Sequence, residues 1–263
     1  MRRYIILAIT AIGLLTTACE ISDGTMDRKP IDVGKTIAQE AHNRLYRETN
    51  IVRLALACDE YLATEDSDIH SNLLRDIFND YYTVSYDSEA NVIRIATISS
   101  DMTYATFHTS GGLLRDGATW TTDEAHNLTF EPKGDKLEVY STVTEDEREL
   151  YNKYNFTLSN ISYSIKDGLS YDVDGHMYIC ESSADKVLDV TIDQRLSFSS
   201  KIHNNVTSSN FVRKGFYAGS MTALYTDTHR GYEDRVTMEY SHSKSITISY
   251  LGEQGTVENY AFK

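Results

Sequence analysis

The chain has 263 residues and a formal net charge of −14 at pH 7, because 39 Asp and Glu residues outnumber 25 Lys and Arg residues. Such a chain repels nucleic acid and anionic lipid head groups, whose binding relies on Lys and Arg, and no basic cluster in the sequence reverses this locally. Its length suffices for one large or two small domains.

The first residues have the charge order of an export signal. Arg2 and Arg3 precede a nearly continuous apolar run from Tyr4 to Leu15. At about 1.5 Å of rise per residue, a helix of this length falls well short of the ~20 residues that span a bilayer. The length and the charge order predict a secretory signal peptide over residues 1–18. The run ends in small residues and is followed by Cys19.

The residues Thr17, Ala18 and Cys19 resemble the lipobox of bacterial lipoproteins. The resemblance covers this end of the chain only. It implies that Cys19 receives lipid on its sulfur, becomes the first residue of the mature chain and attaches it to a membrane of the cell envelope. After Leu15 no apolar run approaches membrane-spanning length, so this lipid would be the membrane anchor. The alternative is ordinary cleavage before Cys19, which leaves a soluble secreted protein.

A polar stretch and a helical segment follow. Residues 19–34 contain Gly24, Pro30 and Gly34 and predict a flexible tether. The next segment, 35–80, is predicted to be helical. In its first part the apolar residues recur at i, i+3, i+4, i+7 and i+11, which places them on one helical face. They are Ile51, Leu54, Ala55, Cys58 and Leu62.

Two details refine the helical segment. Thr36 and Gln39 match a capping box, which favours a helix start there, and a break is expected near Thr49–Asn50. A second apolar stripe over residues 69–80 follows a short acidic linker. The segment is therefore expected to be a helical hairpin.

From Tyr81 onward the apolar period changes from 3.6 to 2. Alternation of this kind is typical of antiparallel strands with one buried face and one solvent-exposed face. The clearest runs are 161–165, 169–173, 235–240 and 245–250. The fold class is therefore α+β: an N-terminal helical hairpin packed on a predominantly antiparallel β-sheet, sandwich or incomplete barrel. Residues 81–263 are expected to form one globular unit with 35–80.

Turn residues support this organisation. Asp167-Gly168 and Asp174-Gly175 favour hairpin turns, because type I′ turns need positive φ. Lys133–Asp135 and Gly252–Gly255 predict looser turns. A capping box that begins at Thr144 indicates one short helix among the strands.

The sequence predicts no catalytic residue, no metal site and no cofactor. Asp172 and Asp174 resemble the start of a calcium loop, but Ser183 occupies the position of its closing Glu, so a hairpin turn is favoured. Cys58 and Cys180 could form a disulfide after export, although a small buried apolar residue is the simpler interpretation of each.

The weak candidates for ligand binding are aromatic. Trp120 is the single Trp, and with Tyr151 and Tyr154 it could stack on a sugar. Ser110–Thr122 and His203–Ser209 are candidate contact loops, since they are rich in Ser, Thr, Gly or Asn.

Three hypotheses of function remain. The favoured one is a lipid-anchored binding or interaction module for a protein or glycan partner at the cell envelope. The others are a structural or assembly accessory of the envelope and a hydrolase without a recognisable motif. The membrane face and the partner are left open by the sequence.

Overall fold

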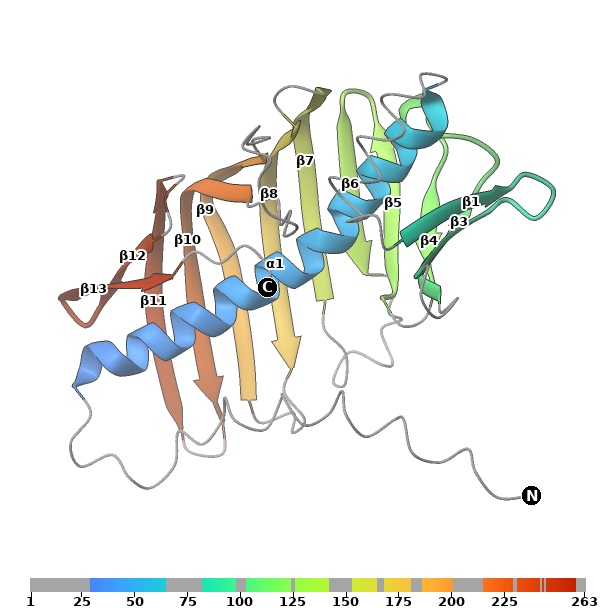
Figure 1. Ribbon diagram of the computed structural model, residues 1–263. Coiled ribbons are helices and arrows are strands. Elements are labelled where there is room, and N and C mark those ends of the chain that lie inside the picture. The colour runs from blue at the N-terminus through green and yellow to red at the C-terminus, as the bar shows by residue number, and fades with distance from the viewer. Residues whose placement is uncertain are drawn as a thin grey trace, which may run out of the picture.

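The computed structural model describes residues 29–64, 82–97, 103–123, 126–141, 153–164, 168–180, 186–200, 215–228, 231–241, 243 and 245–258. It shows one open antiparallel sheet of 13 strands, with a long helix lying diagonally across one of its faces (Figure 1). The helix is α1, Pro30–Ala63. The strands are β1 Tyr82–Asp87, β2 Val92–Thr97, β3 Thr103–Thr109, β4 Trp120–Thr122, β5 Leu128–Lys133, β6 Lys136–Ser141, β7 Lys153–Ser164, β8 Gly168–Cys180, β9 Lys186–Ser200, β10 Gly215–Asp227, β11 Tyr232–Ser241, β12 Ser245–Tyr250 and β13 Glu253–Glu258, with a 3₁₀ turn, η1, at Leu114–Asp116.

The sheet is a meander, because each strand pairs with its neighbours in the chain and the order in space is the order in sequence. The expected α+β class with a mainly antiparallel sheet is confirmed. The sheet is neither a sandwich nor a closed barrel, and the described residues contain one α-helix in place of the expected helical hairpin. The second helix expected at residues 69–80 and the short helix expected from Thr144 lie outside the described residues.

Helix α1 begins earlier than the sequence predicts. It starts at Pro30, inside the expected tether, because the fixed φ of proline suits the first helical position and Asp32 favours the positive end of the helix dipole. The predicted capping box at Thr36 is therefore wrong: Thr36 Oγ1 donates to the carbonyl of Asp32, 3.0 Å away and one turn earlier.

The expected break near Thr49–Asn50 is absent from α1. Thr49 Oγ1 donates to the carbonyl of Leu45 at 2.6 Å, which satisfies the hydroxyl inside the helix. The predicted stripe is confirmed, since Ile51, Leu54, Ala55 and Cys58 are buried and Leu62 is partly buried. The helix contacts β10–β13 and η1. No helix in the described part of the chain is both long and apolar enough to cross a membrane.

Two glycines let α1 approach the sheet closely at its amino end. A Cβ at Gly34 would lie 2.6 Å from Cβ of Tyr250 on β12. A Cβ at Gly255 on β13 would lie 3.0 Å from Cγ1 of Ile31 and from Cε of Lys35. A side chain at Gly34 would force α1 or β12 to move, and one at Gly255 would press on the side chains of Ile31 and Lys35. Gly34 is thus a packing residue of the helix and not part of a tether.

The alternation predicted for 169–173, 235–240 and 245–250 is confirmed, but that predicted for 161–165 is wrong at Ile161, which is 37% exposed beside the register shift between Ser159 and Ser162. Alternate residues of β8, β11 and β12 are buried against α1 and the core, and their neighbours are exposed or half-buried. The expected turns at Gly134 and Gly252 are also present; these glycines have φ of 66° and 82° and connect β5 to β6 and β12 to β13. The turn predicted at Asp174-Gly175 is wrong, because both residues lie inside β8.

Gly175 lies at one of several bulges that interrupt the central ladders. The β8–β9 pairing shifts between Val173 and His176, and the β7–β8 pairing shifts near Asn160, whose φ is 51°. The β9–β10 pairing shifts at Gly219, whose φ is 132°. Because bulges bend strands and increase twist, we infer that these shifts curve the sheet under α1.

Candidate functional site

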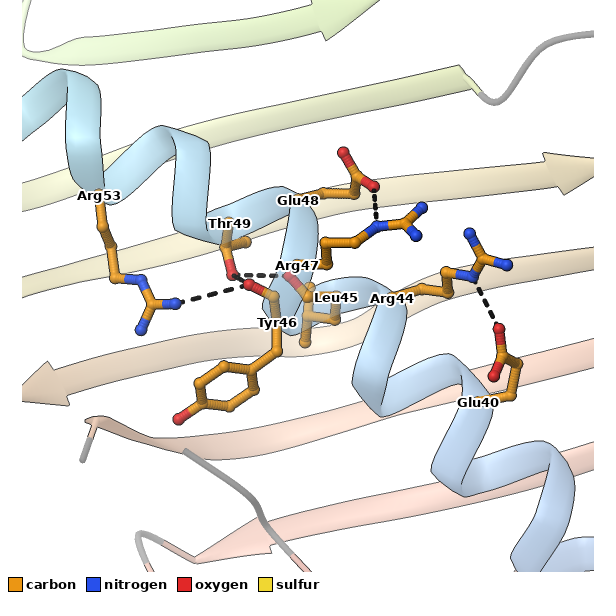
Figure 2. Close-up of polar contacts among 8 residues, drawn as sticks. All are labelled: Glu40, Arg44, Leu45, Tyr46, Arg47, Glu48, Thr49 and Arg53. Carbon is orange, nitrogen blue, oxygen red and sulfur yellow. Dashed lines mark hydrogen bonds and ion pairs between the residues drawn. The ribbon is translucent and has the colours of Figure 1, made fainter. Parts of the chain in front are cut away.

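The middle of α1 packs on the sheet through an aromatic and polar seam. Arg53 lies with its guanidinium carbon 5.1 Å from the ring centres of both Tyr46 and Phe198, which are cation–π distances. One of its terminal nitrogens also donates to the carbonyl of Tyr46 at 3.5 Å. Figure 2 shows Tyr46 and Arg53 on one flank of the helix and the Arg47–Glu48 pair on the other.

Hydroxyl groups connect the seam from helix to sheet. Tyr217 on β10 donates to Thr49 Oγ1 at 2.8 Å, and the hydroxyls of Tyr217 and Tyr171 are 3.3 Å apart. Burial is the main cause that raises the pKa of both tyrosines. These side chains are tightly packed and hydrogen-bonded to one another. The seam therefore fixes the position of α1 and offers little room for a ligand.

A pocket lies beside the carboxyl end of α1, and we call it the end pocket. Its volume is about 420 Å³, within the range of small-ligand sites. Five charged residues line it, Asp59, Glu60, Arg115, Asp135 and Lys136. Its apolar and aromatic lining consists of Leu56, Leu114, Pro132, Leu137, Ile161, Tyr163 and Leu169.

Asp59 organises the polar side of the end pocket. Its Oδ1 accepts the backbone N–H of Leu114 at 2.6 Å and of Arg115 at 3.4 Å, so the carboxylate caps η1. Its Oδ2 accepts Nε–H of Arg115 at 2.9 Å, and the same guanidinium donates to Glu60. One arginine is thereby clamped between two carboxylates on the last turns of α1.

Burial raises the pKa of the Asp59 carboxyl, while Arg115 and the two backbone N–H groups oppose that shift. Asp59 is 5% exposed, but Arg115 has a 40% exposed side chain. The clamp therefore holds a guanidinium at the pocket wall with part of its surface open to solvent. Such a group can orient a bound molecule by hydrogen bonding.

One candidate from the sequence, the loop Ser110–Thr122, contributes Leu114, Arg115 and Gly117 to the end pocket, whereas the aromatic candidates lie elsewhere. Trp120 is fully buried and its Nε1–H donates to the carbonyl of Gly112 at 3.0 Å, and Tyr154 is 6% exposed. Neither ring thus presents an exposed face for stacking on a sugar. Tyr151, Cys19 and the loop His203–Ser209 lie outside the described residues.

The chain matches no family model, no curated protein and no solved structure. The end pocket therefore has to be interpreted from its own chemistry. Among the described residues, no group of three His, Cys, Asp or Glu side chains is arranged to hold a metal ion.

Two more sequence expectations can be placed. Cys58 is a buried free thiol, and burial raises its pKa. Asp172 does not begin a calcium loop in this structure, because it lies within β8 and its carboxylate accepts hydrogen bonds from Asn160 and Ser197, both at 2.7 Å.

Sequence reasoning included Arg115 in the candidate loop Ser110–Thr122 but did not predict its clamp with Asp59. The two residues are 56 positions apart and show no motif spacing. The available signal was the placement of Asp59 directly after Cys58 on the buried stripe. A carboxylate at the edge of a buried stripe needs a hydrogen-bonding or oppositely charged partner, but the sequence does not show which residue that partner is.

Proposed function

We propose that this protein is a lipid-anchored binding module of the cell envelope, and that the end pocket receives an apolar side chain of a partner protein. The observation that carries the proposal is the combination in one pocket of an apolar wall and a clamped, half-open guanidinium. An apolar side chain would pack on the apolar wall, and the Arg115 guanidinium would donate a hydrogen bond to a backbone carbonyl of the partner.

A protein partner suits this pocket better than a neutral glycan. Sugar binding by stacking needs an exposed aromatic face, and the pocket offers one half-buried ring, that of Tyr163. Its most exposed apolar member is Ile161, at 37%. Exposed isoleucine beside a charged rim is the ordinary composition of a small protein contact.

An anchor at Cys19 would attach the protein near the amino end of α1. The helix begins at Pro30, so a fully extended chain from Cys19 reaches at most about 40 Å. Helix α1 has 34 residues and is therefore about 50 Å long. The end pocket lies at the carboxyl end of this helix, so it is separated from the anchored end and is accessible to a partner.

The test uses a photo-crosslinking amino acid at Ile161 in the full-length protein in its own cells. The matched control places the same amino acid at Leu251, an apolar residue that is 74% exposed on the β12–β13 turn. We expect a partner segment to be crosslinked from position 161 and not from position 251. A synthetic peptide with the sequence of that segment should bind the wild-type protein but not the Ile161→Asp variant.

The anchor is tested separately by intact-mass analysis of the mature protein. A lipidated Cys19, with loss of membrane fractionation in Cys19→Ala, is the expected result. An unmodified Cys19 contradicts the anchor. Equal crosslinking from positions 161 and 251, or a peptide that binds Ile161→Asp normally, contradicts the pocket.

A further inference from the structure

A second hollow lies on the face of the sheet that is turned away from α1. Its volume is about 340 Å³, and we call it the outer groove. In β7 the residues Tyr154, Phe156 and Leu158 are buried on the side of α1, so the alternate residues between them belong to the opposite face. The outer groove is lined by Lys136, Asn155, Thr157, Ser159, His176 and Arg195.

A bulge in β9, opposite Gly175 of β8, lies beside this hollow. Between the pairs Val173–Leu196 and His176–Thr191, two residues of β8 face four residues of β9, so the ladder opens. Gly175 has φ of 133° there, and a Cβ would lie 2.0 Å from the carbonyl oxygen of Asn155. The position therefore has no side chain, and the backbone forms the floor of the groove.

Two cations lie in the groove although the chain is strongly acidic. Lys136 on β6 and Arg195 on β9 supply them, and one acid, Asp174, lines the groove with them. Arg195 is only loosely paired, because its Nη1 is 3.8 Å from Asp172 and its side chain is 50% exposed. Its charge thus remains available to an anion.

The uncharged lining indicates a ligand larger than a simple anion. Asn155, Thr157 and Ser159 follow one another on the same face of β7, and a run of this length spans about 13 Å. Their amide and hydroxyl groups both donate and accept hydrogen bonds. Asp174 would repel a small anion, but it can accept a hydrogen bond from a ligand hydroxyl.

We propose that the outer groove binds an acidic sugar, whose carboxylate is held by Arg195 and Lys136 while its hydroxyls meet the polar row on β7. This site is independent of the end pocket, because it lies on the other face of the sheet. Lys136 borders both hollows, so the test relies on other residues.

The test is a ligand-observed NMR titration of the full-length protein with glucuronate, glucose and acetate. Glucose lacks the carboxylate and acetate lacks the ring hydroxyls, so each probe removes one half of the proposed recognition. We expect glucuronate to bind at least about tenfold more tightly than either, because each class of hydrogen bond contributes separately.

Three variants locate the binding. Arg195→Gln should weaken glucuronate at least about tenfold, while Arg94→Gln, the same change at an exposed position of β2, should leave it unaltered. Thr157→Val keeps the side-chain shape and removes a hydroxyl, so it should weaken glucuronate and leave the weak binding of acetate unchanged.

Each outcome decides the proposal. Equal affinity for acetate and glucuronate would show a simple anion site and overturn the assignment to a sugar. No glucuronate binding, or binding that is unchanged in an Arg195→Gln protein with the melting temperature of the wild type, would overturn the site. Arg115→Ala, a change in the end pocket, should not alter glucuronate binding. Failure of the sugar site can therefore be distinguished from failure of the end pocket.

Discussion

Gly34 tests how closely α1 lies on the sheet, because helix propensity and packing predict opposite signs for Gly34→Ala. In an exposed helix interior, replacing Gly by Ala stabilises by about 1 kcal/mol. In this structure the new Cβ would lie 2.6 Å from Cβ and 2.7 Å from Cγ of Tyr250. Favourable carbon–carbon contacts lie at about 3.5–4.0 Å, so the helix or the strand must move.

The size of the effect follows from these two contributions. Forcing one extra methyl group into a packed contact costs about 1–3 kcal/mol. After subtracting the propensity gain, we expect Gly34→Ala to lower the free energy of unfolding by about 1 kcal/mol. Urea unfolding followed by circular dichroism measures it, provided that the slope m is unchanged.

A second substitution separates packing from propensity. In a Tyr250→Gly background the obstructing atoms are gone, so Gly34→Ala should there raise the free energy of unfolding by about 1 kcal/mol. If Gly34→Ala stabilises the protein with Tyr250 in place, the close approach of α1 to β12 is refuted.

Two further predictions concern the clamp and the seam. Asp59→Ala should lower the free energy of unfolding by about 2 kcal/mol, because it strands the buried backbone N–H of Leu114; the ion pair that it also removes contributes less, since the Arg115 side chain is 40% exposed. The neighbouring Glu60→Ala should cost under about 1 kcal/mol, and equal costs in denaturant titrations would contradict the clamp. Burial also raises the pKa of four core tyrosines, Tyr46, Tyr171, Tyr217 and Tyr240. Above pH ~10 the unfolded chain loses these protons and the native chain keeps them, so these four groups together should lower the free energy of unfolding by about 5 kcal/mol for each pH unit above that pH. Tyrosine absorbance should therefore show these four ionising only together with loss of the sheet signal, and full ionisation near pH 10 with an intact sheet would contradict the buried seam.

Local pattern was sufficient to predict most elements of this fold. The stripe from Ile51 to Cys58 and the alternation in β8, β11 and β12 each depend on a single period, which a short window of sequence contains. The start of α1 was misplaced because Pro30 and Gly34 suggest a loop in isolation. The close contact of Gly34 with Tyr250 is a property of the docked helix, and it involves a residue more than 200 positions away.

The same reason explains the error at Asp174-Gly175. An Asp-Gly pair is suited both to a type I′ turn and to a bulge, since both require a residue with positive φ. Which one forms depends on whether the strand continues to pair on both sides. Here β7 and β9 flank β8 along its length, and neither neighbour can be inferred from the dipeptide. The Asp59–Arg115 clamp was missed for an equivalent reason, because the pair meets only when α1 lies on the sheet beside η1.

The bulges connect the fold to the outer groove. Gly175 and Gly219 lie where backbone carbonyls of the adjacent strands come too close for a side chain. The β9 bulge opposite Gly175 contains Arg195, so the same irregularity places the proposed carboxylate-binding residue in the groove. A side chain at position 175 would collide with the carbonyl of Asn155, another residue of the groove lining, and Gly175→Val should therefore disturb the proposed sugar site.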